Sequence, residues 1–354
     1  MEYINLNSLT KKYQTPEKIR QELLLRYAPI TASDQLIVTD AMELLRGEYL
    51  VQEALKNGIR FLPCRRVSHI KETKNFPKRI LLELTSECNS FCTMCPRNSL
   101  VRPKKHLESN LAKKVIQECA EHGISGLWLY YIGESLLHPD FFEILEYCRK
   151  YDSLGPIWLS TNGELLDEKI REKVLDQPVD ILNYSVNAMS EENYKKVTPL
   201  LNFNRVQQNL KELVRRKSKL KKTKPVIRAQ MIEIPYVLNE IEEFKKEFGS
   251  KVDMISVIKL ELFSQGSGNT GNETPNKYIN KCNRLEREDF FIFSDGSVTC
   301  CDTDYNCTFN LGNINKQTIK EIYEGEKYQS LIAEYRGGRL HQHQLCSRCH
   351  DFDL

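Results

Sequence analysis

No segment of this chain is suited to entering or crossing a membrane. A run of about 18 apolar residues does not occur, and Met1 to Asn5 lack the charged-then-apolar pattern of an export signal. The 354 residues nevertheless include 12 cysteines. Without an export signal, so many cysteines favour metal ligation in a reducing compartment over a disulfide framework. We therefore predict a soluble cytoplasmic protein with no membrane partner.

An excess of one charge is also missing. The formal net charge is +3 and the two signs are interspersed, which argues against a dedicated nucleic-acid surface. The exception is the basic run from Arg215 to Lys224. Because this run ends a predicted helix before Pro225, we interpret it as a solvated helix terminus and predict no nucleic-acid partner.

Three closely spaced cysteines are the most informative feature that is present. Cys88, Cys92 and Cys95 have the spacing C-x₃-C-x₂-C. They follow an apolar run from Arg79 to Thr85, which predicts a buried strand. Three thiolates can hold three irons of a cubane [4Fe–4S] cluster and leave the fourth iron open, whereas the usual ferredoxin run supplies a full ligand set. Zinc is the alternative, but no suitable fourth ligand follows within the loop.

This cysteine motif resembles the cluster loop of the radical S-adenosylmethionine (radical SAM) enzymes. The resemblance implies that SAM chelates the fourth iron through its amino and carboxylate groups. It also implies that Met94 lies near the adenine of SAM, at a position where the family usually has an aromatic or large apolar residue.

Beyond this loop, strand and helix patterns alternate from Lys78 to about Leu262. Strands are predicted at 79–84, 126–131, 156–161, 180–186, 225–232 and 253–260, with amphipathic helices between them, for example at 109–121 and 139–150. Six such units match the α/β fold of the radical SAM family, a partial, open (β/α)₆ TIM-like barrel. In α/β barrels the chemistry takes place at the carboxyl ends of the strands.

Three parts are expected along the chain. Residues 1–75 are predicted to form a helical N-terminal extension, 76–263 the barrel, and 264–354 a small cysteine-rich module. Within the extension, Ser33 is predicted to cap a helix that runs to Arg46, and Arg60 to Pro77 are predicted to be a linker. In the last part, a β-hairpin is predicted around Asp295-Gly296 and a helix near 317–335.

The segment after the second predicted strand resembles the family's GGE motif, whose backbone binds the SAM amino group. Gly133 and Glu134 match that motif, whereas Ile132 replaces its first glycine and Ser135 the following proline. A contact made by the backbone tolerates both replacements.

Polar residues at later strand ends resemble further SAM contacts. Ser160 and Asn162 end the third strand and Ser185 ends the fourth. The resemblance implies that Ser185 lies near the SAM carboxylate and Asn162 near the rim of the cofactor, with ordinary turn residues as the alternative. Arg228 interrupts the apolar fifth strand, so it needs a carboxylate from SAM, from the substrate or from a nearby glutamate.

A second set of cysteines lies in the last part of the chain: Cys282, Cys300, Cys346 and Cys349. The set resembles the Twitch module, a shortened SPASM domain that binds one auxiliary [4Fe–4S] cluster. Its spacing is similar to that of the radical SAM dehydrogenases that oxidise inosamines. Zinc is again the alternative, because His341, His343 and His350 lie nearby in the sequence.

Two further cysteines in this part have several possible roles. Cys301 or Cys307 could replace Cys300 as a ligand, or could donate a hydrogen atom to a substrate radical, as in radical SAM epimerases. An inert packed thiol is the other interpretation, and it is the one we give Cys64, Cys119 and Cys148. Asp302 is a candidate general base, together with Asp304, Lys259 and Glu261.

The resemblance implies a radical SAM oxidoreductase. Reductive cleavage of SAM would yield a 5′-deoxyadenosyl radical that abstracts a hydrogen atom from the substrate, and the auxiliary cluster would accept the second electron. We predict a small polyol or aminocyclitol-like substrate and an electron donor of the flavodoxin or ferredoxin type. A peptide-modifying maturase and a radical epimerase are the alternatives. The helical N-terminus differs from the winged-helix leader-binding domain that peptide maturases often carry.

Overall fold

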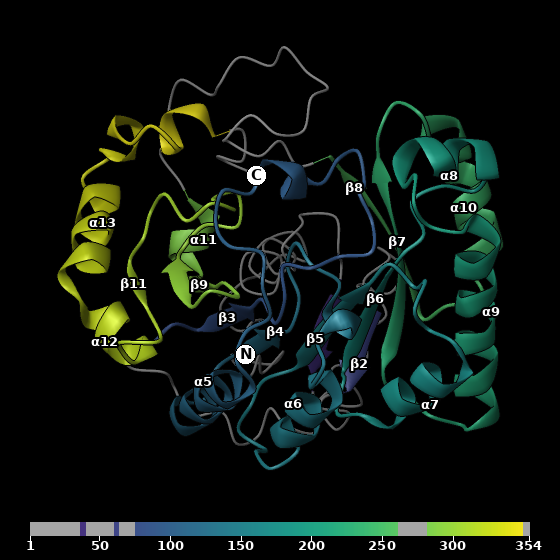
Figure 1. The fold of residues 1–354 in the computed structure, drawn as a ribbon, viewed down its shortest axis with the longest axis horizontal. Coiled ribbons are helices and arrows are strands. Elements are labelled where there is room, and N and C mark those ends of the chain that lie inside the picture. The colour runs from purple at the N-terminus through teal and green to yellow at the C-terminus, as the bar shows by residue number, and fades with distance from the viewer. Residues whose placement is uncertain (1–35, 40–59, 64–74, 261–281, 350–354) are drawn as a thin grey trace, which may run out of the picture.

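The computed structural model describes residues 36–39, 60–63, 75–260 and 282–349, which Figure 1 shows as a coloured ribbon. Within these residues, one sheet of nine strands carries most of the chain. Helices lie along the outside of its strands (Figure 1).

Six parallel strands form the barrel part of this sheet, and they pair in the order in which they occur along the chain. They are β3 (Arg79–Leu82), β4 (Gly126–Trp128), β5 (Ile157–Thr161), β6 (Ile181–Ser185), β7 (Val226–Glu233) and β8 (Met254–Lys259). All six predicted strands are confirmed. In the described residues β8 has no further neighbour, so the barrel stays open.

The helices between these strands are α5 (Ser109–His122), α6 (Phe141–Cys148), α7 (Glu168–Asp176), α8 (Glu191–Val197), α9 (Phe203–Lys219) and α10 (Ile241–Phe248). Short 3₁₀ turns occur at η2 (Pro96–Ser99), η3 (Ser135–Leu137), η4 (Leu238–Glu240), η5 (Leu340–Gln342) and η6 (Cys346–Arg348). The predicted helices at 109–121 and 139–150 are confirmed by α5 and α6. Cys119 and Cys148 are fully buried on these two helices, as packing thiols should be.

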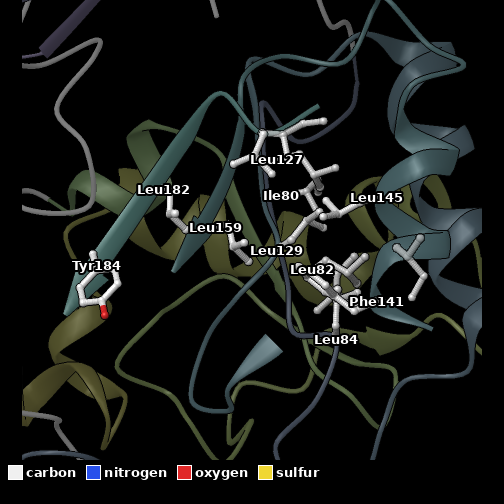
Figure 2. Packing of buried hydrophobic residues seen from close by; sticks show 14 of the residues in the cluster. Ile80, Leu82, Leu84, Leu127, Leu129, Phe141, Leu145, Leu159, Leu182 and Tyr184 are labelled. Atoms are coloured by element: carbon white, nitrogen blue, oxygen red, sulfur yellow. The ribbon is translucent and has the colours of Figure 1, made fainter. Parts of the chain in front are cut away.

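The strands bury both of their faces. Side chains such as Ile80, Leu82 and Leu159 point toward the helices and form the larger core, shown in Figure 2. Alternate residues, among them Leu81 and Trp128, form a second cluster on the other face. Burial on both faces explains why these strands are nearly continuous apolar runs in the sequence.

The C-terminal module extends the same sheet. Its elements are α11 (Asn283–Glu286), β9 (Asp289–Ile292), β10 (Ser297–Thr299), β11 (Gly312–Asn313), α12 (Ile319–Glu324) and α13 (Glu326–Arg336). Strand β9 pairs in parallel with β3, on the side opposite β4. The predicted hairpin is confirmed, with Gly296 at a φ of 85° in its turn. The single helix predicted near 317–335 is instead two helices, because Gly325 adopts an extended conformation between them.

The N-terminal prediction is wrong where the structure describes it. Residues Leu36–Thr39 form strand β1 and Arg60–Pro63 form strand β2, and the two pair in parallel. A helix from Ser33 to Arg46 and an irregular linker from Arg60 were expected at these positions. The run Ile37-Val38-Thr39 is β-branched, which favours a strand over a helix. The other helices predicted for this extension lie outside the described residues.

The basic run at the end of α9 is paired with acidic side chains. Arg216 forms two hydrogen bonds of 2.6 and 2.8 Å with Glu172, and Lys222 lies 3.3 Å from Asp176. This pairing agrees with the interpretation of the run as a helix terminus. None of the helices in the described part of the chain is long and apolar enough to cross a membrane.

Candidate active site and second cysteine site

The first cysteine triad lies on the loop that leaves the carboxyl end of β3. The amide of Cys95 donates to the carbonyl of Cys92 at 3.0 Å, and the Ser90 hydroxyl lies 3.1 Å from the Cys92 sulfur. Burial raises the pKa of the Cys88 and Cys92 thiols to about 12 and that of Cys95 to about 11. Each of these thiols also raises the pKa of another member of the triad, so the three lie close together.

The C-x₃-C-x₂-C spacing and the burial of the triad fit three corners of an iron–sulfur cluster. In the described residues no three His, Cys, Asp or Glu side chains converge on a point where one ion could be held. A cubane distributes its ligands over different irons, so its cysteines need only surround a buried volume. The triad is therefore suited to hold three irons of a [4Fe–4S] cluster.

Gly133 and Glu134 lock the next loop against the cysteine loop. The Glu134 amide donates to the Glu87 carbonyl at 2.9 Å. A Cβ added to Gly133 would lie 2.0 Å from the carbonyl oxygen of Thr85, so no other residue fits at this close approach of two backbones. At the replaced positions, Ile132 is buried and the Ser135 hydroxyl donates to the Leu129 carbonyl at 2.7 Å.

The carboxyl group of Glu134 joins the loops that follow β4 and β5, while its backbone amide contacts the loop after β3. It accepts hydrogen bonds from the amides of Asn162, at 2.8 Å, and Leu136, at 3.3 Å. Burial raises its pKa to about 7, although these donors oppose the shift. The Asn162 side chain in turn donates to Asn89 at 2.8 Å and lies 4.0 Å from the Cys88 sulfur. The structure thus brings Glu134 and Asn162 to the cysteine loop.

Arg228 and Ser160 belong to a polar chain across three neighbouring strands. The side-chain amide nitrogen of Asn183 donates to the Ser160 hydroxyl at 3.0 Å, and Arg228 Nε donates to Asn183 Oδ1 at 2.9 Å. The guanidinium of Arg228 also lies over the Trp158 ring, 5.4 Å from its centroid. Burial lowers the pKa of Arg228 to about 10.

The remaining predicted SAM contacts lie near this chain and the loop. Ser185 is half-buried at the end of β6, and Met94 is nearly buried against the larger core. No contact described for either residue connects it with the other predicted ones.

The second cysteine set lines one pocket. Its lining includes all four predicted ligands, Cys282, Cys300, Cys346 and Cys349, and also Cys301. Burial raises the pKa of the Cys282, Cys300, Cys301 and Cys346 thiols. The pocket is therefore suited to an auxiliary cluster, with one thiol more than the four ligands that a closed cubane needs.

The two spare cysteines occupy different places. Cys301 lines the pocket, and its sulfur lies 3.2 Å from the Thr303 hydroxyl. Cys307 does not line the pocket. It packs with Phe291 and Phe293 in the second hydrophobic cluster, on the face of the sheet opposite the larger core, and its backbone has a φ of 57°. Burial raises the pKa of Cys307 to about 12.

The histidines of the zinc alternative have other partners. His343 contacts Glu334, and His341 lies 3.1 Å from the carbonyl of Gly338 on the surface. His350 lies outside the described residues, as do Cys64 and Glu261. The two described histidines do not line the pocket.

The two aspartates after Cys301 are both buried. Asp302 contacts Arg284, and its carbonyl accepts from the hydroxyl of Tyr131. Asp304 accepts from the amide and hydroxyl of Thr308, at 2.7 and 2.6 Å. The Asp304 carboxylate also accepts from the Phe309 amide and the Thr299 hydroxyl, so it fixes the conformation of the loop between Thr299 and Phe309.

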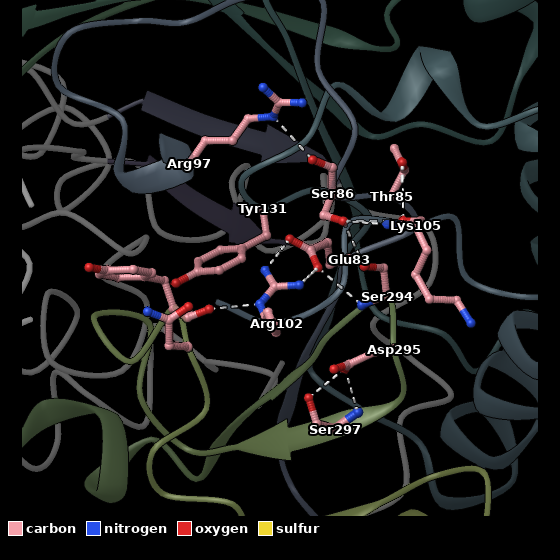
Figure 3. A network of polar contacts seen from close by, with 12 residues as sticks. Glu83, Thr85, Ser86, Arg97, Arg102, Lys105, Tyr131, Ser294, Asp295 and Ser297 are labelled. Carbon is pink, nitrogen blue, oxygen red and sulfur yellow. Dashed lines mark hydrogen bonds and ion pairs between the residues drawn. The ribbon is translucent and has the colours of Figure 1, made fainter. Parts of the chain in front are cut away.

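A buried ion pair that the motifs do not reveal joins the two modules (Figure 3). Arg102 donates to both carboxylate oxygens of Glu83, at 2.6 and 2.7 Å, and to the carbonyl of Tyr305 at 2.7 Å. The amide of Ser294 donates to the same carboxylate at 3.0 Å. A signal for this network exists in the sequence: Glu83 is a charge within an apolar strand, which requires a buried partner.

Two family models match the chain. Residues 82–230 match the radical SAM superfamily, and residues 282–350 match SPASM, an iron–sulfur cluster-binding domain. Both matched regions contain the cysteine sets described above. They imply [4Fe–4S] clusters and SAM as the cofactors.

Curated relatives match over part of their length. GTP 3′,8-cyclase from Clostridium perfringens (strain 13 / Type A) is 25% identical over 143 residues, which cover 40% of this chain and 44% of the relative. AdoMet-dependent heme synthase from Methanosarcina barkeri is 35% identical over 125 residues, which cover 34% of this chain and 35% of the relative. The chain thus spans less than half the length of these relatives.

Solved structures share the fold over a larger part of the chain. SuiB from Streptococcus suis, bound to S-adenosylmethionine, has a TM-score of 0.58 at 13% identity. The match covers 80% of this chain and 72% of the SuiB chain. Native anSMEcpe with bound AdoMet has a TM-score of 0.55 at 20% identity, and the match covers 77% of this chain and 90% of the anSMEcpe chain. BtrN in complex with AdoMet and 2-DOIA has a TM-score of 0.51 at 16% identity, and the match covers 77% of this chain and 93% of the BtrN chain. These likenesses confirm the predicted α/β fold with its C-terminal module.

Proposed function

We propose that this radical SAM protein with a C-terminal SPASM domain is an oxidoreductase that removes two electrons from a small hydroxylated or aminated substrate. The observation that carries the proposal is the pocket lined by Cys282, Cys300, Cys346 and Cys349. Four cysteines can ligate every iron of a cubane, which leaves no open iron for a substrate. Such a cluster is suited to electron transfer, in contrast to the one held by the triad.

Each part of the chain has a distinct task in this proposal. The cysteine triad would hold a cluster that, reduced by a donor of the flavodoxin or ferredoxin type, would cleave bound SAM and so supply a 5′-deoxyadenosyl radical for hydrogen abstraction. The Gly133 backbone and Asn162 hold the SAM-binding rim against the cysteine loop. Arg228, buried and positively charged beside the polar chain from Ser160, can bind a carboxylate or hydroxyl group.

Proton removal is assigned to a group near the second pocket. Oxidation of an alcohol or amine releases one proton along with the second electron. We propose Asp302 as the acceptor, with Cys301 or Cys307 as a hydrogen-atom donor in the epimerase alternative. Both cysteine thiols are protonated at neutral pH because burial raises their pKa.

The first test is the amount of iron and sulfide in the anaerobically reconstituted chain. We expect about eight irons per chain, about four after replacement of Cys88, Cys92 and Cys95 by alanine, and about four after replacement of the four distal cysteines. Replacement of Cys119 and Cys148 by alanine is the matched control, because these thiols are buried on α5 and α6 and belong to neither cysteine set, and it should leave about eight. About four irons in the wild type would contradict a two-cluster enzyme.

The second test separates the substrate classes. Deuterated polyols and aminocyclitols are incubated with SAM and a reductant, and deuterium is measured in 5′-deoxyadenosine. Transfer of the label, together with a product three mass units lighter than the deuterated substrate because one deuterium and one exchangeable proton are lost, supports the dehydrogenase. Label transfer only from a peptide supports the maturase. An unlabelled substrate incubated in D₂O that gives a product one mass unit heavier, with the deuterium at an inverted centre, supports the epimerase.

A further inference from the structure

A buried ion pair lies at the wall of the second cysteine pocket. Arg284 lines this pocket together with Cys282 and Cys301. Its guanidinium contacts Asp302, and the two side chains are only 7% and 5% exposed. The other carboxylate oxygen of Asp302 is buried and has no hydrogen-bond partner in the described residues. Both charges therefore lie out of solvent, where electrostatic interactions are least screened.

The cationic member of the pair faces the thiols. Arg284 follows Cys282 by two residues in the chain, and its side chain lines the same pocket as Cys282 and Cys301. Asp302 directly follows Cys301 in the chain and brings the opposite charge to Arg284. The guanidinium therefore stabilises negative charge in the pocket, and the carboxylate partly cancels this effect.

We propose that Arg284 raises the reduction potential of the auxiliary cluster and that Asp302 fixes the guanidinium in place and limits the increase. A cluster gains one negative charge when it is reduced, so a buried cation at its side favours the reduced form. Net charge near the sulfurs is a principal determinant of cluster potentials. This inference rests on the proposed function in one respect, namely that the pocket holds a cluster.

The pair is also connected to the barrel. The Tyr131 hydroxyl donates to the Asp302 carbonyl, and the Tyr131 ring stacks on Phe293 with 5.4 Å between centroids. Tyr131 lies two residues before Gly133, whose backbone contacts the triad loop. Contacts through Tyr131 and Gly133 thus connect the segment that carries Asp302 with the loop of the triad. A potential set by Arg284 would make the auxiliary cluster a suitable acceptor for an electron that leaves the substrate.

The test measures the midpoint potential of the auxiliary cluster by redox titration followed by EPR. The full chain is used, both in its wild-type form and with Cys88, Cys92 and Cys95 replaced by alanine, so that only the auxiliary signal remains. Arg284→Gln is expected to lower the potential and Asp302→Asn to raise it. We expect each change to alter the reduction equilibrium at least tenfold, which is about 59 mV for a one-electron couple.

Two kinds of control distinguish charge from structure. Arg284→Lys keeps the positive charge, so its midpoint potential should stay close to the wild-type value. Arg216→Gln and Glu172→Gln break an ion pair between α9 and α7, on the surface, and should leave the midpoint potential unchanged. Shifts of the same sign in Arg284→Gln and Asp302→Asn, or an equal shift in Arg284→Lys and Arg284→Gln, would overturn the inference. Absence of iron from the triad-free chain would contradict the proposed function instead.

Discussion

At the residue scale, the ionisation of one buried carboxyl group links the stability of the site to pH. Burial raises the pKa of Glu134 to about 7, from an ordinary value near 4.5. Between these two values the folded chain holds a proton that the unfolded chain has lost. Stability therefore decreases as pH rises from about 4.5 to 7, by roughly 3 kcal/mol for a shift of this size.

The prediction is tested by urea unfolding of the reduced, metal-free chain at pH 5, 6 and 7. Glu134→Gln should flatten the decrease, since glutamine does not ionise. His138 does not produce this decrease, because burial lowers its pKa and a lowered histidine pKa costs stability only as pH falls. Glu240→Gln is the control: Glu240 is another buried glutamate, which accepts from the Met189 amide at 2.7 Å. An unchanged slope in Glu134→Gln would contradict the assignment.

Single residues differ in how well the sequence predicts their role. The spacing of Cys88, Cys92 and Cys95 is local, so it identifies a cluster loop without any structure. The role of Glu134 in joining the loops after β4 and β5 depends on Asn162, which comes 28 residues later. Arg284 could not be identified at all, because the pocket wall it forms is assembled from distant segments of the chain.

At the element scale, a side chain of the barrel caps a helix of the C-terminal module. The carboxylate of Glu118, on α5, accepts from the amides of Ile319 and Lys320 at 3.0 Å each. These amides belong to the first turn of α12, where a negative charge is favourable. Glu118→Ala should therefore destabilise the chain by about 1–2 kcal/mol.

Chemical denaturation of the reconstituted protein measures this loss. The matched control is Glu121→Ala on the same helix, because Glu121 is exposed and only accepts from Gln117 at 2.8 Å. Limited proteolysis should also cleave Glu118→Ala sooner near α12 than it cleaves the wild type. Equal stability of the two variants would show that the α5–α12 contact contributes nothing.

Elements were predictable where their patterns are strong. The six barrel strands are apolar runs that are buried on both faces, and all six were predicted. The break at Gly325 was missed because its neighbours continue an amphipathic pattern on either side. At strand β1 two local signals conflict: Ser33 can cap a helix, whereas the β-branched run Ile37-Val38-Thr39 favours the strand that forms.

At the scale of the whole molecule, the two cysteine sites belong to one continuous sheet. The pairing of β3 with β9 joins segments about 210 residues apart, and neither strand carries a signal for its partner. The loop after the triad also contacts a distant segment of the chain that its sequence does not indicate. The Val101 amide donates to the Asn306 side chain at 2.8 Å, and that side chain donates to the Ser99 carbonyl at 3.0 Å. The sequence therefore predicts both sites but not how they are fixed relative to each other.

The ion pair of Glu83 with Arg102 is the strongest candidate for the contact that makes the two modules unfold together. Glu83 is fully buried and is bound by Arg102 from the barrel and by the Ser294 amide from the C-terminal module. Removal of one partner from a buried pair costs about 3–5 kcal/mol, because the other charge stays buried. Glu83→Gln should lose this amount in denaturant unfolding and should separate one transition into two. Glu191→Gln breaks an exposed pair with Lys195 and should cost less than about 1 kcal/mol. If Glu83→Gln unfolds like Glu191→Gln, the β3–β9 pairing alone couples the two sites.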